Sequence, residues 1–373
     1  MHLQTTTPSV KNHRILHLIL SIFLVAGLTG VQPMYAAGEE LTDAEITNAV
    51  QDELLYNTTT PAYMIDVSTT DGIVLLEGTV DDLLSKDRAT TVASSVKGVR
   101  GVVNELEVNV PVRADADLEK DVEEAILTDP AADKYQVAVS VNDGTVTLTG
   151  TVDSWQEKQL VEYVTKSVVG VREVENAVDV SYDVNRSDME IRNEIQSLLR
   201  NDVRVDHALI DVAVSDGHVT LSGTVGSLLE KQQTLNTAWV PGVFGVDADA
   251  LSIEDWARDE KYRKGKYEMR PDDEIRKAVE DALMIDPRVY SFSPEVIVDE
   301  GTVKLTGFVD NLKAKQSAEQ TARNVVGVQR VKNYLRVRPT EEIAEENLES
   351  QVEQALRRDP IVRSYKIGVE ANN

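Results

Sequence analysis

The sequence predicts an α+β fold, a tandem repeat of small α-β-β-α-β units, each a three-stranded sheet with two helices on one face. Two observations lead to this prediction. A pair of glycines within an alternating apolar and polar stretch recurs four times, and a third glycine follows the second by 19 or 20 residues each time. Apolar residues at helical spacing flank these stretches, so helices and strands follow one another in a fixed order.

Residues 1–37 predict a secretory signal peptide. They contain two basic residues and no acidic residue, and an apolar run extends from Ile15 to Leu28. A basic start, an apolar core of about 7–15 residues and small residues at the end, here Ala36-Ala37, are typical of such peptides. An uncleaved anchor is the alternative, but a membrane span needs about 20 residues. We therefore expect a periplasmic protein without a transmembrane segment after cleavage.

Composition narrows the classes of function. The chain has 373 residues, a net charge of −26 at neutral pH and no cysteine. An acidic surface repels the phosphates of DNA and RNA, so no nucleic-acid partner is expected. Without cysteine there are no disulfides, thiolate zinc sites, iron–sulfur clusters or cysteine nucleophiles. Beyond residue 37 only His207 and His218 remain, which makes metal sites and histidine general bases hard to build.

Each predicted unit begins with an acidic helix, which in most units ends at an Asp-Pro pair such as Asp129-Pro130. A hairpin of two alternating strands follows, and it turns at an Asp-Gly or Glu-Gly pair; around Asp143-Gly144 the strands extend from Val139 to Val152. A second helix with an apolar stripe then leads to a Gly-Val pair and a last strand. Two helices packed on one face of the sheet would bury every stripe.

Three glycines mark equivalent positions in each of the four full units. We expect the first to take positive φ in the hairpin turn. The second, near the end of the second strand, lets the following helix approach closely. The third suits the C′ position of the second helix. These signature glycines are Gly72, Gly78, Gly98, Gly144, Gly150, Gly170, Gly217, Gly223, Gly242, Gly301, Gly307 and Gly327.

This combination of motifs resembles the BON domain family (bacterial OsmY and nodulation). The second unit matches most closely over residues 143–152 and 169–176, and the fourth over Gly301–Val309 and Val326–Asn333. In the third unit Ala248 stands where the other units have Asn, so we expect its last strand to be irregular. The resemblance covers nearly all of residues 41–373 apart from linkers, and it implies the predicted fold.

The predicted boundaries follow the repeats. Residues 1–37 form the signal peptide, and the four full BON-like units span 41–112, 116–183, 187–253 and 271–338. A charged aromatic linker occupies residues 254–270, and residues 343–373 form a partial fifth unit.

The fifth unit begins with a predicted helix at Glu345–Arg357 and a predicted strand at Tyr365–Val369. The spacing of the other units places its turn glycine one residue beyond Asn373. A terminal cap and a truncated chain are both compatible with this spacing. The missing pairing partner of the strand favours truncation.

No set of residues predicts catalysis. The acidic pairs Asp81-Asp82, Glu123-Glu124 and Asp272-Asp273 are expected at turns or helix starts, where the helix dipole favours them. The acidic turns at Asn142–Gly144 and Asp299–Gly301 lack the alternating ligands and the closing glutamate of a calcium loop. We therefore expect a protein that is not an enzyme and that holds no cofactor and no metal.

The most unusual local chemistry lies in the linker. Residues 261–270 contain five basic residues and one acidic residue. Aromatic and basic residues together suit a membrane interface or an anionic polymer, and each base contributes about 1 kcal/mol near an anionic leaflet. A soluble linker that offsets the surrounding acidic residues is the alternative. The candidate binding residues are Trp256, Lys261, Tyr262, Arg263, Lys264, Lys266, Tyr267 and Arg270.

The resemblance implies a cell-envelope role in osmotic-stress protection, with attachment to a phospholipid membrane surface through the BON-like domains. The expected partners are therefore that surface or envelope proteins. The alternative is a soluble interaction scaffold or chaperone-like stress protein that contacts envelope proteins without lipid. The net charge of −26 favours this alternative, because it opposes an anionic leaflet unless the contact is local.

Overall fold

The fold is that of a computed structural model, which describes residues 41–57, 64–132, 135–182, 186–258, 269–339, 345–362 and 365–371. The chain separates into two compact parts, Met1–Ala37 and Gly38–Asn373, and every described residue lies in the second. The predicted signal peptide lies outside the described residues. Within the described ranges, no helix has both the length and the apolar character needed to cross a bilayer.

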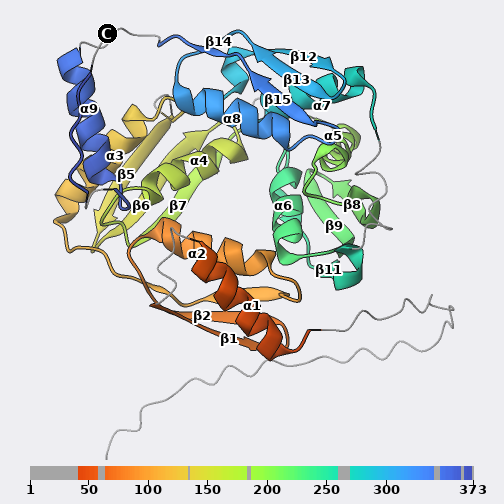
Figure 1. The fold of residues 1–373 in the computed structure, drawn as a ribbon, viewed down its shortest axis with the longest axis horizontal. Coiled ribbons are helices and arrows are strands. Elements are labelled where there is room, and N and C mark those ends of the chain that lie inside the picture. The colour runs from red at the N-terminus through yellow and green to blue at the C-terminus, as the bar shows by residue number, and fades with distance from the viewer. Residues whose placement is uncertain are drawn as a thin grey trace, which may run out of the picture. The chain divides into compact units, whose positions relative to one another are not determined.

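The second unit displays the architecture that the full units share (Figure 1). It consists of α3 (Asp115–Thr128), β5 (Gln136–Asn142), β6 (Thr145–Val152), α4 (Trp155–Lys166) and β7 (Glu173–Val180). β5 and β6 form an antiparallel hairpin, and β7 pairs in parallel with β6, which is therefore central. Val146 and Leu148 of β6 are fully buried with residues of both helices, whereas Thr149 and Thr151 are exposed on the other face. The predicted α-β-β-α-β unit is confirmed.

The other full units repeat this order. The first contains α1 (Asp43–Tyr56), β1 (Ile65–Thr70), β2 (Ile73–Val80), α2 (Leu83–Ser95), β3 (Gly101–Asn104) and β4 (Glu107–Val108). The third contains α5 (Asp188–Asn201), η2 (His207–Leu209), β8 (Ile210–Ser215), β9 (His218–Val225), α6 (Leu228–Ala238), β10 (Gly245–Asp247) and β11 (Leu251–Ile253). The fourth contains α7 (Asp272–Met284), η5 (Tyr290–Phe292), β12 (Glu295–Asp299), β13 (Thr302–Thr306), β14 (Phe308–Val309), α8 (Leu312–Arg323), β15 (Arg330–Asn333) and β16 (Arg336–Val337).

The last strand of the third unit is irregular, as predicted. In the second unit every residue of β6 pairs with the residue 28 positions later in β7. In the third unit His218 pairs with Gly245, 27 positions later, but Gly223 pairs with Leu251, 28 positions later. One extra residue therefore lies between β10 and β11, which is the arrangement of a bulge.

Each hairpin turn is held by an acidic residue of the first helix. Asp143 and Gly144 have φ of 48° and 77°, and positive φ at both central residues is what a type I′ turn requires. The carboxylate of Asp115, in the first turn of α3, accepts hydrogen bonds from the N–H groups of both residues, at 3.0 and 3.2 Å. The equivalent residues that bind the other three turns are Asp43, Asp188 and Asp272.

Two predicted roles of the signature glycines are wrong, although all twelve have positive φ. Gly170 does not occupy the C′ position of α4. It is the third residue of a turn that the Val171 N–H closes onto the Val168 carbonyl at 3.3 Å. The close approach at Gly150 is to the first strand of the hairpin instead of the next helix, because a Cβ there would lie 2.1 Å from the Gln136 carbonyl oxygen.

The second helix of every full unit begins at a side-chain cap in the same position. The Asp82 carboxylate accepts from the Ser85 N–H at 2.7 Å, and Ser154 accepts from the Glu157 N–H at 3.2 Å. Ser227 and Asn311 cap α6 and α8 in the same way. Of the acidic pairs, only Glu123-Glu124 departs from expectation, because it lies inside α3 instead of at a turn or helix start.

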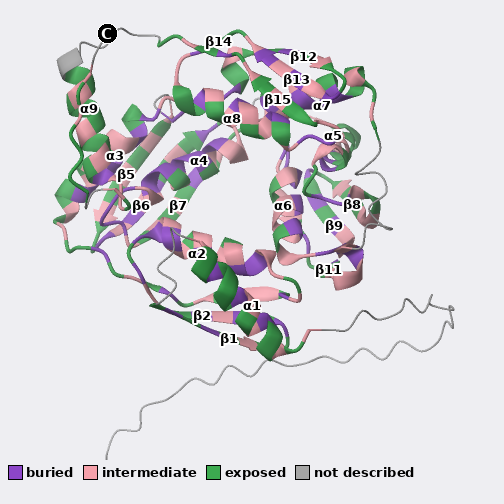
Figure 2. Ribbon diagram, in the orientation of Figure 1, coloured by how far each residue is buried: buried purple, intermediate pink, exposed green. Residues whose placement is uncertain are grey.

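Each full unit has its own aliphatic core, between its helices and its sheet (Figure 2). Four residues pack across unit boundaries: Leu83 of α2 and Val108 of β4 against the core of the second unit, Leu228 of α6 against that of the first, and Ile285 after α7 against that of the third. Because one face of each sheet carries no helix, the residues that alternate onto that face remain available to other partners.

The fifth unit contains α9 (Glu345–Arg358), as predicted. Residues 365–369, for which we predict a strand, have no strand structure. A strand needs a partner for its backbone groups, and no described residue pairs with this segment. The helix end packs on the second unit, where the Val169 N–H donates to the Arg358 carbonyl at 2.8 Å.

Candidate functional site

The described residues include both histidines that follow the predicted signal peptide. They contain no group of three or more His, Asp or Glu side chains arranged to hold a metal ion. His218 lies at the start of β9, with its Nδ1 3.1 Å from the Asp216 carbonyl oxygen. His207 lies in η2, where burial and then the nearby Arg200 lower its pKa. The contacts given for both histidines are therefore with residues close to them in the sequence.

Only two of the eight predicted binding residues lie in the described part of the chain. Trp256 is half-buried in the short helix η3 (Asp255–Arg258), and Arg270 precedes α7. The other six lie outside the described residues: Lys261, Tyr262, Arg263, Lys264, Lys266 and Tyr267. The binding role of the aromatic and basic linker thus stays a prediction. The structure describes only the two ends of this segment.

Both ends of the linker are tied to folded units. The Asp255 carboxylate accepts from the Gly98 N–H at 3.3 Å, and Arg258 donates to the Ser95 carbonyl at 3.2 Å. Arg270 donates to the Asn201 side chain at 2.6 Å and to the Arg200 carbonyl at 3.0 Å, at the C-terminal end of α5. A cation is stabilised there by the helix dipole. Arg270 therefore joins the third unit to the fourth.

A second group of bases lies on the open sheet face of the fourth unit, and the sequence reasoning missed it. Every second residue from 330 to 338 is exposed, while the residues between them pack toward α8 and the core. We name as the basic sheet face the five bases on this side: Lys304, Arg330, Lys332, Arg336 and Arg338. The signal for it in the sequence is the base at every second position over most of residues 330–338, an alternation that the last strand of the repeat also requires.

Apolar side chains interrupt these bases. Tyr334 is 58% exposed, and Phe308 of β14 is 47% exposed. The Arg338 guanidinium lies 4.4 Å from the centre of the Phe308 ring, which is a cation–π contact. Two acidic residues, Glu295 and Asp299, lie on the opposite edge strand, β12, and Asp299 approaches Lys304 at 3.9 Å.

The corresponding strand of the second unit carries the opposite charge. β7 exposes Glu173, Glu175 and Asp179, which stand in the same register as Arg330, Lys332 and Arg336. The reversal of charge therefore belongs to the fourth unit and is not a property of the repeat.

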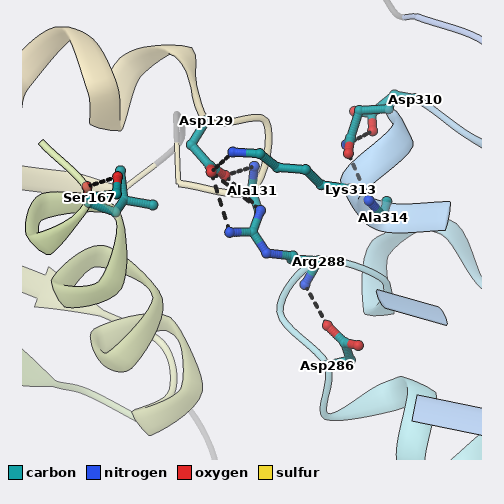
Figure 3. A network of polar contacts seen from close by, with 10 residues as sticks. Asp129, Ala131, Ser167, Asp286, Arg288, Asp310, Lys313 and Ala314 are labelled. Carbon is teal, nitrogen blue, oxygen red and sulfur yellow. Dashed lines mark hydrogen bonds and ion pairs between the residues drawn. The ribbon is translucent and has the colours of Figure 1, made fainter. Parts of the chain in front are cut away.

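A buried ion pair joins the second and fourth units (Figure 3). The carboxylate of Asp129, only 2% exposed, accepts from Arg288 at 3.0 Å and from Lys313 at 2.8 Å. Burial raises the pKa of Asp129, but the Lys313 hydrogen bond and the Arg288 charge outweigh it, so this pKa lies below its usual value. Nearby, the Tyr290 hydroxyl lies 3.4 Å from Glu157. The second and fourth units are therefore joined by polar contacts at specific residues.

An aromatic stack joins the second and third units. The rings of Trp155 and Trp239 lie 4.2 Å apart and are tilted by 11°. The Gln156 side chain donates to the Trp239 carbonyl at 2.8 Å. Trp155 thus packs against another unit. A stacked aromatic pair of this kind contributes about 0.5–1.5 kcal/mol beyond the burial of its surface.

Comparison with known proteins identifies the repeats. Residues 42–110, 114–182, 187–255 and 271–339 each match the BON domain. The osmotically-inducible protein Y of Escherichia coli (strain K12) is 29% identical over 150 residues, which cover 38% of this chain and 75% of that protein.

Similarity to solved structures is weaker. CdsD, a structural protein of the type III secretion system of Chlamydia trachomatis, is 12% identical over 55% of this chain and 90% of its own, with a TM-score of 0.16. The PrgH periplasmic domain is 12% identical over 55% of this chain and 99% of its own, with a TM-score of 0.14. Scores this low support no argument about the whole chain. The four domain matches, however, together span more than half of its length, and the chain therefore belongs to the BON domain family.

Proposed function

We propose that this chain is an exported, non-enzymatic protein of the periplasm that acts in osmotic or envelope stress and attaches to phospholipid membrane surfaces. The name of the Escherichia coli relative supports the stress role. Family membership supports a binding role over a catalytic one. The expected signal peptide supports export.

The observation that carries membrane attachment is the basic, aromatic linker and the way it is joined to the protein. Its upstream end is tied to the first unit through Asp255 and Arg258, and its downstream end is tied to the third through Arg270. A segment with four bases between two anchored ends can bring its charges to a surface without moving a folded unit.

Electrostatics decides whether such a contact can succeed on a chain of charge −26. Charges are screened over about 8 Å at physiological ionic strength, so distant acidic residues contribute little repulsion. Bases at the surface contribute about 1 kcal/mol each. Four bases of the linker therefore outweigh the long-range repulsion when they lie directly on an anionic leaflet.

The test is vesicle co-sedimentation of residues 38–373. We expect binding to vesicles that contain phosphatidylglycerol, weaker binding at high salt, and little binding to pure phosphatidylcholine. A linker variant with Lys261→Ser, Arg263→Ser, Lys264→Ser and Lys266→Ser should bind at least tenfold more weakly. Arg270 is kept, because its guanidinium holds α5.

A matched control removes the same charge elsewhere. Four bases that pair with acidic residues one turn away on helices are replaced by Ser: Arg276, Lys277, Arg323 and Arg357. This control should bind nearly as the parent does. If the folded parent binds neither vesicle, membrane attachment is wrong, and the soluble interaction scaffold, which the net charge favours, replaces it.

A further inference from the structure

We propose that the basic sheet face of the fourth unit is a second, independent contact with anionic phospholipid, and that it docks flat on the membrane surface. The inference rests on the proposed membrane attachment. It adds a site that neither the linker nor the repeat pattern predicts: Lys304, Arg330, Lys332, Arg336 and Arg338.

The geometry of the strands makes this face a rigid array of cations. Side chains two residues apart on a strand point the same way and lie about 6.6–6.8 Å apart. Arg330 and Lys332 lie on β15, Arg336 on β16, and Lys304 on the neighbouring β13. Because parallel pairing holds β15 against β13 and β16 against β14, the backbone positions of these bases are set before any ligand arrives.

One pair of residues indicates that this charge is not needed for folding. Lys304 lies directly opposite Lys332 in the parallel register, and like charges opposite each other destabilise a sheet. At the same positions of the second unit, Thr147 donates a hydrogen bond to Glu175 at 3.1 Å. The second unit thus has the more favourable pair. In the fourth, Lys304 approaches Asp299 at 3.9 Å, whereas Lys332 forms no ion pair with a described acidic residue.

The bases of the last strand are also available. Arg330, Lys332 and Arg336 are exposed, and none of them forms an ion pair with a described acidic residue. Among the described residues, the acidic side chains that this face presents are Glu295 and Asp299, on the far strand β12. Positive charge therefore prevails on the side of β15 and β16.

The choice of occupant follows from charge and area. The acidic face of β7 in a second copy would complement these bases. However, β12 and the paired runs 302–309 and 330–337 are five to eight residues long and about 4.8 Å apart, so they present only about 340 Å². A specific protein interface buries about 800 Å² on each partner. A phospholipid surface needs no such matched area, because each headgroup is bound separately.

The apolar side chains of the face suit the same occupant. Tyr334 and Phe308 stand among the bases with about half of their surface exposed. Aromatic rings are favoured at the headgroup level of a membrane. The guanidinium of Arg338 lies over the Phe308 ring. This places a cation beside an aromatic ring, which is the pairing that suits the headgroup level of an anionic membrane.

The test is co-sedimentation of residues 38–373 with vesicles of phosphatidylcholine and phosphatidylglycerol. The face variant carries Arg330→Thr, Lys332→Thr and Arg336→Thr, because threonine suits an exposed strand position. Each base near an anionic leaflet contributes about fivefold in affinity, so we expect binding about 100-fold weaker than that of the parent. Circular dichroism and the melting temperature should show that the variant is folded.

The control carries Glu173→Thr, Glu175→Thr and Asp179→Thr, at the equivalent positions of β7. It should bind vesicles at least as well as the parent. If the face variant binds within twofold of the parent while the linker variant loses binding, the inference is wrong and the proposed function stands. If the parent binds no anionic vesicle, both are wrong.

Sedimentation velocity without lipid tests whether this face instead binds a second copy of the chain. A parent that self-associates, with association lost in both the face variant and the β7 control, would assign this face to a second copy and overturn the inference. A monomeric parent, with vesicle binding that depends on the face, supports it.

Discussion

The contact between the second and fourth units depends on one carboxylate. Asp129 is almost fully buried, and it accepts hydrogen bonds from Arg288, whose side chain is 16% exposed, and from Lys313, which is 59% exposed. The carboxylate also accepts from the Ala131 N–H of its own loop. Removal of its charge would leave the buried guanidinium without a partner, whereas the ammonium could return to water.

We predict that Asp129→Asn weakens this contact by about 2 kcal/mol at neutral pH, most of it from Arg288. Hydrogen exchange measures the effect at residues 289–292 of the fourth unit, away from the substitution. The amides of Val289, Tyr290 and Phe292 donate within this turn. Their exchange should become about 30-fold faster.

The pH dependence of this effect has a definite sign. The pKa of Asp129 is lowered in the folded protein, so its contribution is complete above the ordinary value of 3.8 and is lost as the pH falls through the folded-state pKa. The difference between parent and variant should therefore be constant near neutrality and shrink in acid. A difference that vanished near pH 6 would contradict this assignment.

Asp143→Asn is the matched control for Asp129→Asn. Asp143 also forms an ion pair, with Arg172 at 3.3 Å, but its side chain is 90% exposed. Exposed pairs contribute little, and Asn tolerates the positive φ of this turn position. We expect no measurable change in exchange at residues 289–292.

At the scale of elements, the C-terminal end of α5, the first helix of the third unit, contacts the loop after α8, the second helix of the fourth unit. The Val326 N–H donates to the Asn201 carbonyl, and the Val203 N–H donates to the Asn324 carbonyl, both at 2.8 Å. The fifth unit repeats the first of these bonds on the second unit, where Val169 donates to Arg358. Pro360 stands at the position of Val203 and has no N–H to complete the pair.

We predict that Val203→Pro loosens the contact between the third and fourth units without unfolding either. Asp202 has φ −85° and ψ 120°, close to the −80° and 117° of Asp129 before Pro130, so the backbone accepts proline here. Loss of one backbone hydrogen bond costs about 1 kcal/mol. Amide exchange at Val326 should become about fivefold faster.

Val203→Ala is the matched control, because it shortens the side chain and keeps the N–H. Its effect on exchange at Val326 should be much smaller. Equal effects of the two substitutions would mean that side-chain packing, and not the backbone bond, couples these elements.

At the scale of the whole molecule, four separate aliphatic cores are joined by polar contacts, by the Trp155–Trp239 stack and by a few apolar side chains. The apolar residues of the described structure that pack against a neighbouring core are Leu83, Val108, Leu228 and Ile285. Small independent cores unfold as separate cooperative units when the free energy that couples them is small.

We therefore predict that thermal unfolding of residues 38–373 does not follow a two-state transition. Differential scanning calorimetry should give a calorimetric enthalpy well above the van't Hoff enthalpy. Asp129→Asn should separate the component transitions further, because it weakens one coupling contact. A ratio of one in the parent would show instead that the contacts between units make the array a single cooperative body.

The sequence by itself determined the units, because their signals are local. Turn pairs such as Asp143-Gly144, the glycine after each second strand and the periodicity of each helix act within about 70 residues, and they recur four times. The irregular last strand of the third unit was also predicted, from Ala248 at the position where the other units have Asn.

Only the tertiary structure decided what the units do to one another and which faces stay open. Asp129 looks like any residue of the repeated Asp-Pro motif, and its partners Arg288 and Lys313 lie more than 150 positions away. The bases on β15 and β16 became a surface only when pairing placed them beside Lys304. Contacts between distant residues leave no periodic signal in the chain, because they depend on how folded units pack and not on local backbone preference.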